Sequence, residues 1–163
     1  MPDNVAVSNR QRRFRIDAGQ LGRAVERVLE IAGAGGQEVS VLLVSDRAMR
    51  SLNRDYRGKD EPTDVLSFSM REGEWGDVSG TMLGDLVISL ETVSRQAGIE
   101  WDDDRPVTGT PRRELALMTI HGLLHLLGHE HERGKKKAEQ MRLRECELFG
   151  QAWEWFPEFE LRR

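Results

Sequence analysis

All four histidines of the chain lie between positions 121 and 131, in the segment His-Gly-Leu-Leu-His-Leu-Leu-Gly-His-Glu-His. His121 and His125 stand four residues apart within an apolar run, so on a helix both imidazoles leave the same face. Gly128 can end such a helix in a left-handed conformation and turn the chain back. His131 follows just beyond the turn, within reach of the same point in space. Because histidine is the commonest metal ligand, the segment predicts a glycine-terminated helix that carries a three-histidine metal site.

The third ligand could be His129 or His131. The order His-x₃-His-x₂-Gly-x₂-His matches metzincin proteases, in which the last histidine is a ligand, and this favours His131. Structural zinc sites usually have four protein ligands and are rich in cysteine, whereas the single Cys146 lies well down the following segment. Three imidazoles leave one position of Zn²⁺ open for water, whose pKa a metal can lower from 15.7 to about 7. The pattern therefore indicates a zinc hydrolase, although nickel, copper or manganese also bind imidazole.

One residue argues against a protease. Zincin proteases carry a glutamate directly after the first histidine, where it acts as the general base. This chain has Gly122 at that position, and glycine cannot accept a proton. A metalloprotease-like hydrolase therefore stays an alternative that would need a base from elsewhere.

Composition describes one globular domain spanning residues 1–163, with 38% hydrophobic and 32% charged residues. No apolar run approaches the roughly 18 residues of a spanning helix, so we expect no membrane partner. The absence of a signal pattern and the single cysteine favour the cytoplasm. The net charge of −4 argues weakly against nucleic acid, yet basic residues cluster in three places and leave the partner open. These clusters are Arg12, Arg13 and Arg15; Arg47, Arg50, Arg54, Arg57 and Lys59; and Lys135, Lys136 and Lys137.

Hydrophobic periodicity predicts an α+β fold, with a small mixed four-stranded sheet packed against about five helices. Strands are expected at 5–9, 39–44, 65–68 and 83–90, and helices at 17–32, 45–56, 91–98, 112–127 and 135–155. Loops are expected at 71–80 and 102–111, and the aromatic residues after 152 should form a packed terminus. The metal-bearing helix should be central, because it is hydrophobic around most of its circumference.

A second informative segment runs from residue 53 to residue 68 and contains Tyr56-Arg-Gly-Lys-Asp and Pro62-Thr-Asp-Val-Leu-Ser-Phe. Alone, its Arg57 would be read as part of a surface ion pair. This segment, Leu83-Gly-Asp-Leu-Val-Ile and the histidine run nevertheless resemble, in the same order, the YbeY family of bacterial endoribonucleases. The resemblance covers about residues 38–150, and three motifs together are far more specific than one.

The resemblance implies a metal-dependent, single-strand-specific endoribonuclease that acts in 16S rRNA 3′-end maturation and ribosome quality control. It implies that His121, His125 and His131 hold zinc and that Arg57 is functionally essential. A guanidinium that is always charged could brace a phosphate while the metal polarises oxygen. Ribosomal RNA, the small subunit and assembly factors become the expected partners. Asp85, in the Leu-Gly-Asp motif, could orient a ligand or serve a structural role.

Other questions stay open at the level of sequence. The chain could instead be a non-catalytic ribosome-assembly factor in which zinc only fastens the loop after the long helix. RNA cleavage could proceed by hydrolysis or by attack of the ribose 2′-OH, and oligomeric state is undetermined. The charged connection at 102–113 looks longer than is usual in the family.

Overall fold

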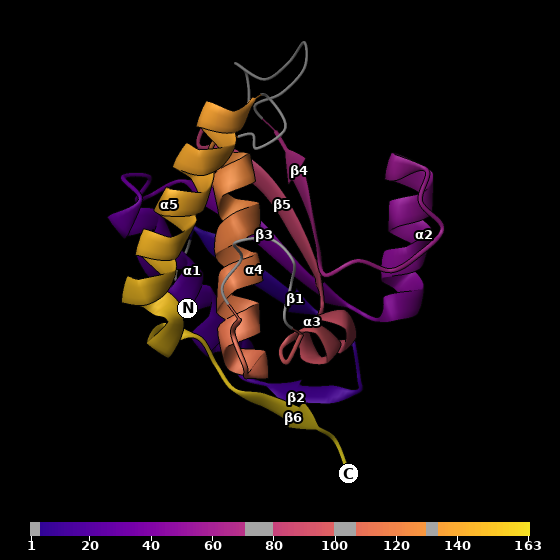
Figure 1. Ribbon diagram of the computed structural model, residues 1–163. Coiled ribbons are helices and arrows are strands. Elements are labelled where there is room, and N and C mark those ends of the chain that lie inside the picture. Colours follow the sequence, from indigo (N-terminus) through magenta and orange to yellow (C-terminus); the bar gives the residue numbers. More distant parts are fainter. Residues whose placement is uncertain (1–3, 71–79, 100–106, 130–133) are drawn as a thin grey trace.

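The computed structural model describes residues 4–70, 80–99, 107–129 and 134–163. Its main sheet contains β1 (Val5–Asn9), β3 (Glu38–Val44), β5 (Met82–Ser89) and β4 (Val65–Ser69), in the order β1-β3-β5-β4 (Figure 1). The first two pairings are parallel, and β4 runs antiparallel to β5 at the edge. The predicted mixed four-stranded sheet is confirmed.

The helices are α1 (Ala18–Ile31), α2 (Asp46–Arg57), α3 (Leu90–Gln96), α4 (Pro111–Leu126) and α5 (Lys135–Ala152), followed by the 3₁₀ turn η2 (Trp153–Trp155). The side chains of Asp17, Ser45, Ser89 and Thr110 cap the first four helices at their N-termini. Each cap oxygen accepts a backbone N–H that would otherwise lack a partner. The five helices confirm the prediction, with ends within one to three residues of those expected. None of the described helices is both long and apolar enough to span a membrane.

Strand alternation gives the sheet two apolar faces. Residues such as Val41 and Leu86 join the main core with α1 and α4, whereas Leu66 and Val87 form a smaller cluster with Met49 of α2. Helix α4 is buried along most of its length and contacts α1, α3, α5, β4 and β5. The expected central helix is therefore confirmed, and it lies against the β4–β5 side of the sheet (Figure 1).

A second, two-stranded sheet was not predicted. It pairs β2 (Phe14–Ile16) with β6 (Phe159–Leu161) in antiparallel register, and the Phe14 and Phe159 rings meet at 5.2 Å. The expected packed aromatic terminus is confirmed, since Phe156 is fully buried and Arg27 stacks over the Trp155 ring. Three-residue strands are too short for periodicity to reveal them.

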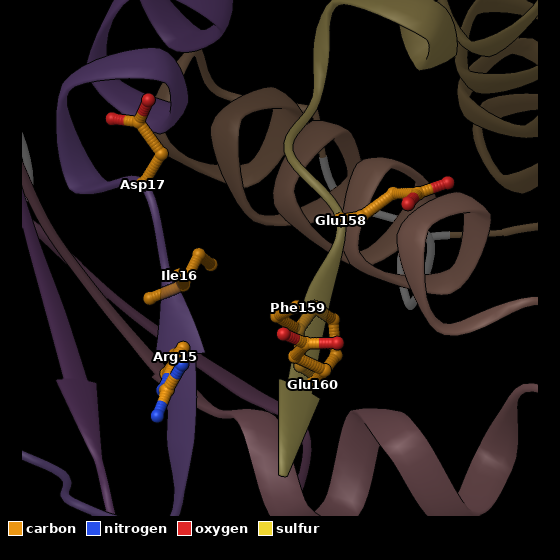
Figure 2. Close-up of a pocket in the computed structure, with 6 residues that line it drawn as sticks. All are labelled: Arg15, Ile16, Asp17, Glu158, Phe159 and Glu160. Atoms are coloured by element: carbon orange, nitrogen blue, oxygen red, sulfur yellow. The ribbon is translucent and has the colours of Figure 1, made fainter. Parts of the chain in front are cut away.

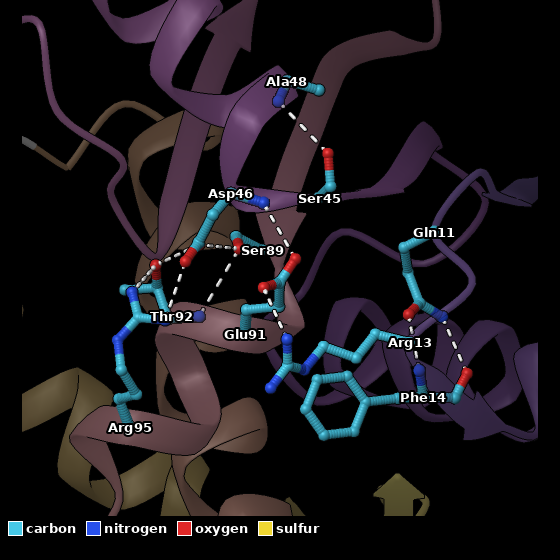
Figure 3. Close-up of polar contacts among 10 residues, drawn as sticks. All are labelled: Gln11, Arg13, Phe14, Ser45, Asp46, Ala48, Ser89, Glu91, Thr92 and Arg95. Atoms are coloured by element: carbon cyan, nitrogen blue, oxygen red, sulfur yellow. Dashed lines mark hydrogen bonds and ion pairs between the residues drawn. The ribbon is translucent and has the colours of Figure 1, made fainter. Parts of the chain in front are cut away.

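Helix α2 is anchored at its first residue. The Asp46 carboxylate accepts hydrogen bonds from Ser89 Oγ, Thr92 Oγ1 and Arg95 at 2.6–2.7 Å, and its backbone N–H donates to Glu91 (Figure 3). Partial burial disfavours the charged form, but these donors and the Arg95 charge outweigh it and lower the pKa of Asp46. This network fixes the N-terminus of α2 against α3. It therefore also helps to position Arg57, which lies at the other end of α2.

Candidate metal centre

His121 and His125 meet on one face of α4. Their Nε2 atoms lie 3.1 Å apart and their ring centroids 4.6 Å apart, and both side chains are half-buried. The spacing would suit a hydrogen bond between the rings. It is also close to the roughly 3.3 Å between two nitrogens that each lie 2.0–2.1 Å from a tetrahedral zinc. These two imidazoles therefore fit adjacent positions around such an ion.

Glu145 of α5 orients one of the two imidazoles. Its Oε1 lies 2.6 Å from His121 Nδ1, and the residue is only 9% exposed. A carboxylate accepts, so Nδ1–H donates and the lone pair is left on Nε2, the atom that faces His125. Metal-binding histidines commonly have such a carboxylate partner, which fixes the tautomer and strengthens the ligand. This donor set supports a metal site.

Sequence reasoning missed Glu145, although a signal existed. The buried positions of α5 are Met141, Glu145, Leu148 and Ala152, which recur at helical spacing. A carboxylate therefore interrupts an otherwise apolar stripe. Because a buried charge requires a partner, the interruption points to a polar group on the facing helix.

The end of α4 has the predicted glycine turn. Gly128 has φ +95°, its N–H donates to the His125 carbonyl, and the N–H of His129 donates to the Leu124 carbonyl. These two bonds form a Schellman motif, which ends the helix and reverses the chain. Residue 131 lies outside the described residues, so the choice of His131 over His129 stays a prediction. Among the described residues no set of three metal-binding side chains is present.

Gly122 marks the face of α4 that touches the sheet. A Cβ built there would lie 2.8 Å from Leu86 Cδ2, 3.1 Å from Val65 Cγ2 and 3.2 Å from Ser67 Oγ. A glutamate at this position would push into the sheet. The position that carries the zincin general base is thus used here for helix packing, which explains physically why glycine occupies it.

Arg57 is the last residue of α2, and the loop that follows it is hydrogen-bonded back to the helix. Gly58 adopts φ +70°, and the buried Asn53 donates from Nδ2 to the Glu61 carbonyl at 2.8 Å. Within the described residues Arg57 makes no hydrogen bond or ion pair, and it is exposed. A guanidinium held by its backbone but left open to solvent can receive an anionic ligand.

Strand β4 links Arg57 to the histidines. Ser67 Oγ donates to the Gly122 carbonyl of α4, whereas the adjacent Phe68 points to the other face and contacts Tyr56, the neighbour of Arg57. The two parts of the predicted site therefore flank one edge strand from opposite faces.

Asp85 lies on the α2 face of the sheet. It pairs with Phe68 across the strands, while its neighbour Leu86 is the residue that Gly122 meets on α4. Alternation directs the Asp85 side chain away from α4, so Glu145 and not Asp85 is the carboxylate that orients His121.

Figure 2 shows a separate open depression of about 410 Å³ along β2 and β6. Its lining is Arg15, Ile16, Asp17, Glu158, Phe159 and Glu160. Three carboxylates and one guanidinium lie along it without a hydrogen-bonded cluster among them, and it contains none of the predicted site residues. Its place near the start of α4 separates it from the histidines toward the other end of that helix (Figure 1).

Comparison with known proteins shows the family of the chain. The family model described as Endoribonuclease YbeY matches residues 6–152, from β1 to the end of α5. The chain belongs to the YbeY endoribonuclease family. The resemblance seen in the sequence is thereby confirmed, and η2 and β6 lie beyond the matched segment.

Relatives of the YbeY family match most of the chain. It is 40% identical over 146 residues to Endoribonuclease YbeY of Geobacter metallireducens, covering 89% of this chain and 93% of the relative. The Pelotomaculum thermopropionicum protein of the same name is 44% identical over 152 residues, covering 90% and 95%. The solution structure of TM1509 from Thermotoga maritima superposes with a TM-score of 0.61 at 28% identity, covering 93% and 91%. The relatives thus support the same family, and the TM1509 structure shares the fold of this chain.

Proposed function

We propose that this YbeY-family chain is a zinc-dependent endoribonuclease that cleaves single-stranded RNA. It would act in the cytoplasm, in 16S rRNA 3′-end maturation and ribosome quality control. Its partners would be the small ribosomal subunit and assembly factors. The observation that carries the proposal is the convergence of the His121 and His125 Nε2 atoms beside the carboxylate of Glu145. The endoribonuclease name shared by the relatives supports RNA as the substrate.

Each residue has a distinct task in this proposal. When bound, zinc supplies a Lewis acid for a phosphate oxygen and activates a nucleophile at neutral pH. His121, His125 and His131 hold it, and Glu145 keeps the His121 Nδ1 proton in place. The Arg57 guanidinium braces the phosphate of the scissile bond through paired N–H donors. A 2′,3′-cyclic phosphate product would indicate attack by the ribose 2′-OH, and a 5′-phosphate product would indicate hydrolysis.

The position of Gly122 supports RNA over peptide as substrate. In zincin proteases the residue after the first histidine supplies the base, but here that position faces Leu86 and Val65 of the sheet. Helix α4 therefore offers no general base beside its first histidine.

The test measures bound metal by mass spectrometry and cleavage of single-stranded RNA on the same samples. We expect one zinc in wild type and in Arg57→Ala, none in His125→Ala, and cleavage by wild type alone. Arg47→Ala is the matched control, because Arg47 is an exposed arginine about 15 Å away along the same helix. It should retain zinc and cleavage.

Three outcomes would each contradict part of the proposal. Equal trace cleavage by all four proteins would mean a contaminating nuclease, and bound zinc would then favour the assembly-factor alternative. Normal cleavage by Arg57→Ala would remove Arg57 from the site. Stoichiometric zinc loss in His129→Ala would transfer the third ligand from His131 to His129.

A further inference from the structure

An exposed aromatic pair lies directly beside Arg57. Tyr56, the only tyrosine of the chain, is 67% exposed, which is the highest value among the large hydrophobic residues described. Its ring meets that of Phe68 on β4 at 5.1 Å and 71°. This T-shaped contact holds the tyrosine ring from one side, and most of the residue stays open to solvent.

The two aromatic rings extend the smaller apolar cluster under α2 out to the protein surface. Leu52, one turn earlier on α2, and Phe68 both pack on the smaller apolar cluster under α2. Tyr56 continues the same helix face past that cluster, and Met70, two residues after Phe68, is 47% exposed. An apolar surface of this kind, open at the end of a helix and a strand, is suited to a flat ligand.

Arg57 offers an anionic polymer a positive charge directly beside the pair. Arg50, Arg54 and Arg57 recur at helical spacing on α2, and all three are exposed. Arg50 and Arg54 have carboxylate partners, but Arg57 has no ion pair among the described residues. Asp85, the cross-strand neighbour of Phe68 on the same face of the sheet, is exposed and would repel phosphate. A base on the aromatic pair would therefore leave its phosphate toward Arg57.

The position of β4 connects this surface to the metal centre. Phe68 faces α2, and the adjacent Ser67 is hydrogen-bonded to Gly122, which lies between the two histidines in α4. Strand β4 is the edge of the sheet, so a flexible polymer can pass around it from one face to the other. Single-stranded RNA has the flexibility to do so, and its unpaired bases are free to stack.

We propose that Tyr56, supported by Phe68, is a platform on which one nucleobase of single-stranded RNA stacks, and that it sets the register of the RNA relative to Arg57 and the histidine pair. This inference rests on the proposed function, because it names the subsite beside the same metal centre. Aromatic stacking tolerates any base, so the platform selects unpaired RNA rather than a sequence. In a duplex the base is not available for stacking on the protein.

The test compares wild type, Tyr56→Ala and Tyr56→Phe for binding of a short single-stranded oligoribonucleotide by fluorescence anisotropy, with zinc present. Tyr56→Ala should weaken binding about 5- to 150-fold. Tyr56→Phe keeps the ring and should restore most of the affinity. Leu161→Ala is the control, because Leu161 is an exposed apolar residue on β6, at the other end of the fold.

A second set of RNAs tests stacking itself. Each carries one abasic ribose, moved along the strand. At one position the missing base should weaken wild-type binding by about the same factor as Tyr56→Ala, and should cost Tyr56→Ala nothing further. The platform would be overturned if Tyr56→Ala bound intact RNA as tightly as wild type does. It would also be overturned if Tyr56→Ala weakened binding of every abasic RNA by the same factor as binding of intact RNA. Either result would leave the surface to a protein partner.

Binding and cleavage are scored separately. Wild type that binds but never cleaves would refute the proposed catalysis while the abasic series still decides on Tyr56. Wild type that cleaves, with no effect of Tyr56→Ala on affinity, would refute the platform alone.

Discussion

Replacing Gly122 by alanine tests whether α4 depends on its close approach to the sheet. Alanine in a helix is favoured over glycine by about 0.5–1 kcal/mol. The added Cβ would lie 2.8 Å from Leu86 Cδ2, and Leu86 is fully buried, so its side chain could move only by displacing packed neighbours. Overpacking of this kind typically costs about 1–3 kcal/mol, so we expect Gly122→Ala to lower the free energy of unfolding by about 0.5–2 kcal/mol.

The matched control is Gly150→Ala in α5. Gly150 is also helical, but a Cβ there would have no neighbour within 4 Å. This variant should be more stable than wild type by about 0.5–1 kcal/mol. Urea unfolding followed by tryptophan fluorescence, with zinc held constant, measures both variants. If Gly122→Ala proved as stabilising as Gly150→Ala, α4 would not be held by this contact, and the packing explanation for glycine at position 122 would be wrong.

Three further predictions follow from contacts around the site. Glu145→Ala should weaken zinc binding about 10- to 100-fold by releasing His121, which competition with a chelator measures; unchanged affinity would separate Glu145 from the metal. Because the pKa of Asp46 is lowered below 3.8, its carboxylate adds stability above that pH, and the contribution is lost as pH falls through the lowered value. Asp46→Asn should therefore be less stable at neutral pH and decline less steeply in acid unfolding, and parallel curves would refute the role. Asn53→Ala should cost about 1–2 kcal/mol, seen as a lower urea midpoint, because it removes the buried bond to the Glu61 carbonyl.

The elements that could be predicted from sequence are those with strong local signals. Periodic apolar residues placed α1 and α2 within one residue of their observed starts. Asp17 and Ser45, which each accept from an N–H of the first turn, explain why the helices begin there. The turn at Gly128 was also predictable from local sequence, because glycine readily adopts the left-handed backbone conformation that ends a helix. By contrast, the pairing of β2 with β6 depends on partners far apart in sequence, and no short window encodes it.

The site divides in the same way. His121 and His125 were predictable, because four-residue spacing on a helix alone brings them together. Glu145 was not, because its role depends on how α5 packs against α4, which is a tertiary fact. The placement of Arg57 and the histidines on opposite faces of β4 also required the sheet order. His131 lies outside the described residues, and its assignment stays with the motif.

The β2–β6 ribbon has a kinetic consequence. Arg162 and Phe14, which are 148 positions apart, are joined through it, and the backbone N–H of Arg162 donates to the Arg13 carbonyl. Contacts between residues so distant along the chain require a large loss of chain entropy before the contacts themselves can stabilise the fold. A ribbon of three residues per strand offers few contacts of its own, and its Phe14 and Phe159 side chains are buried in the main core. We therefore expect the ribbon to close late in folding, once the core that receives these two rings has formed.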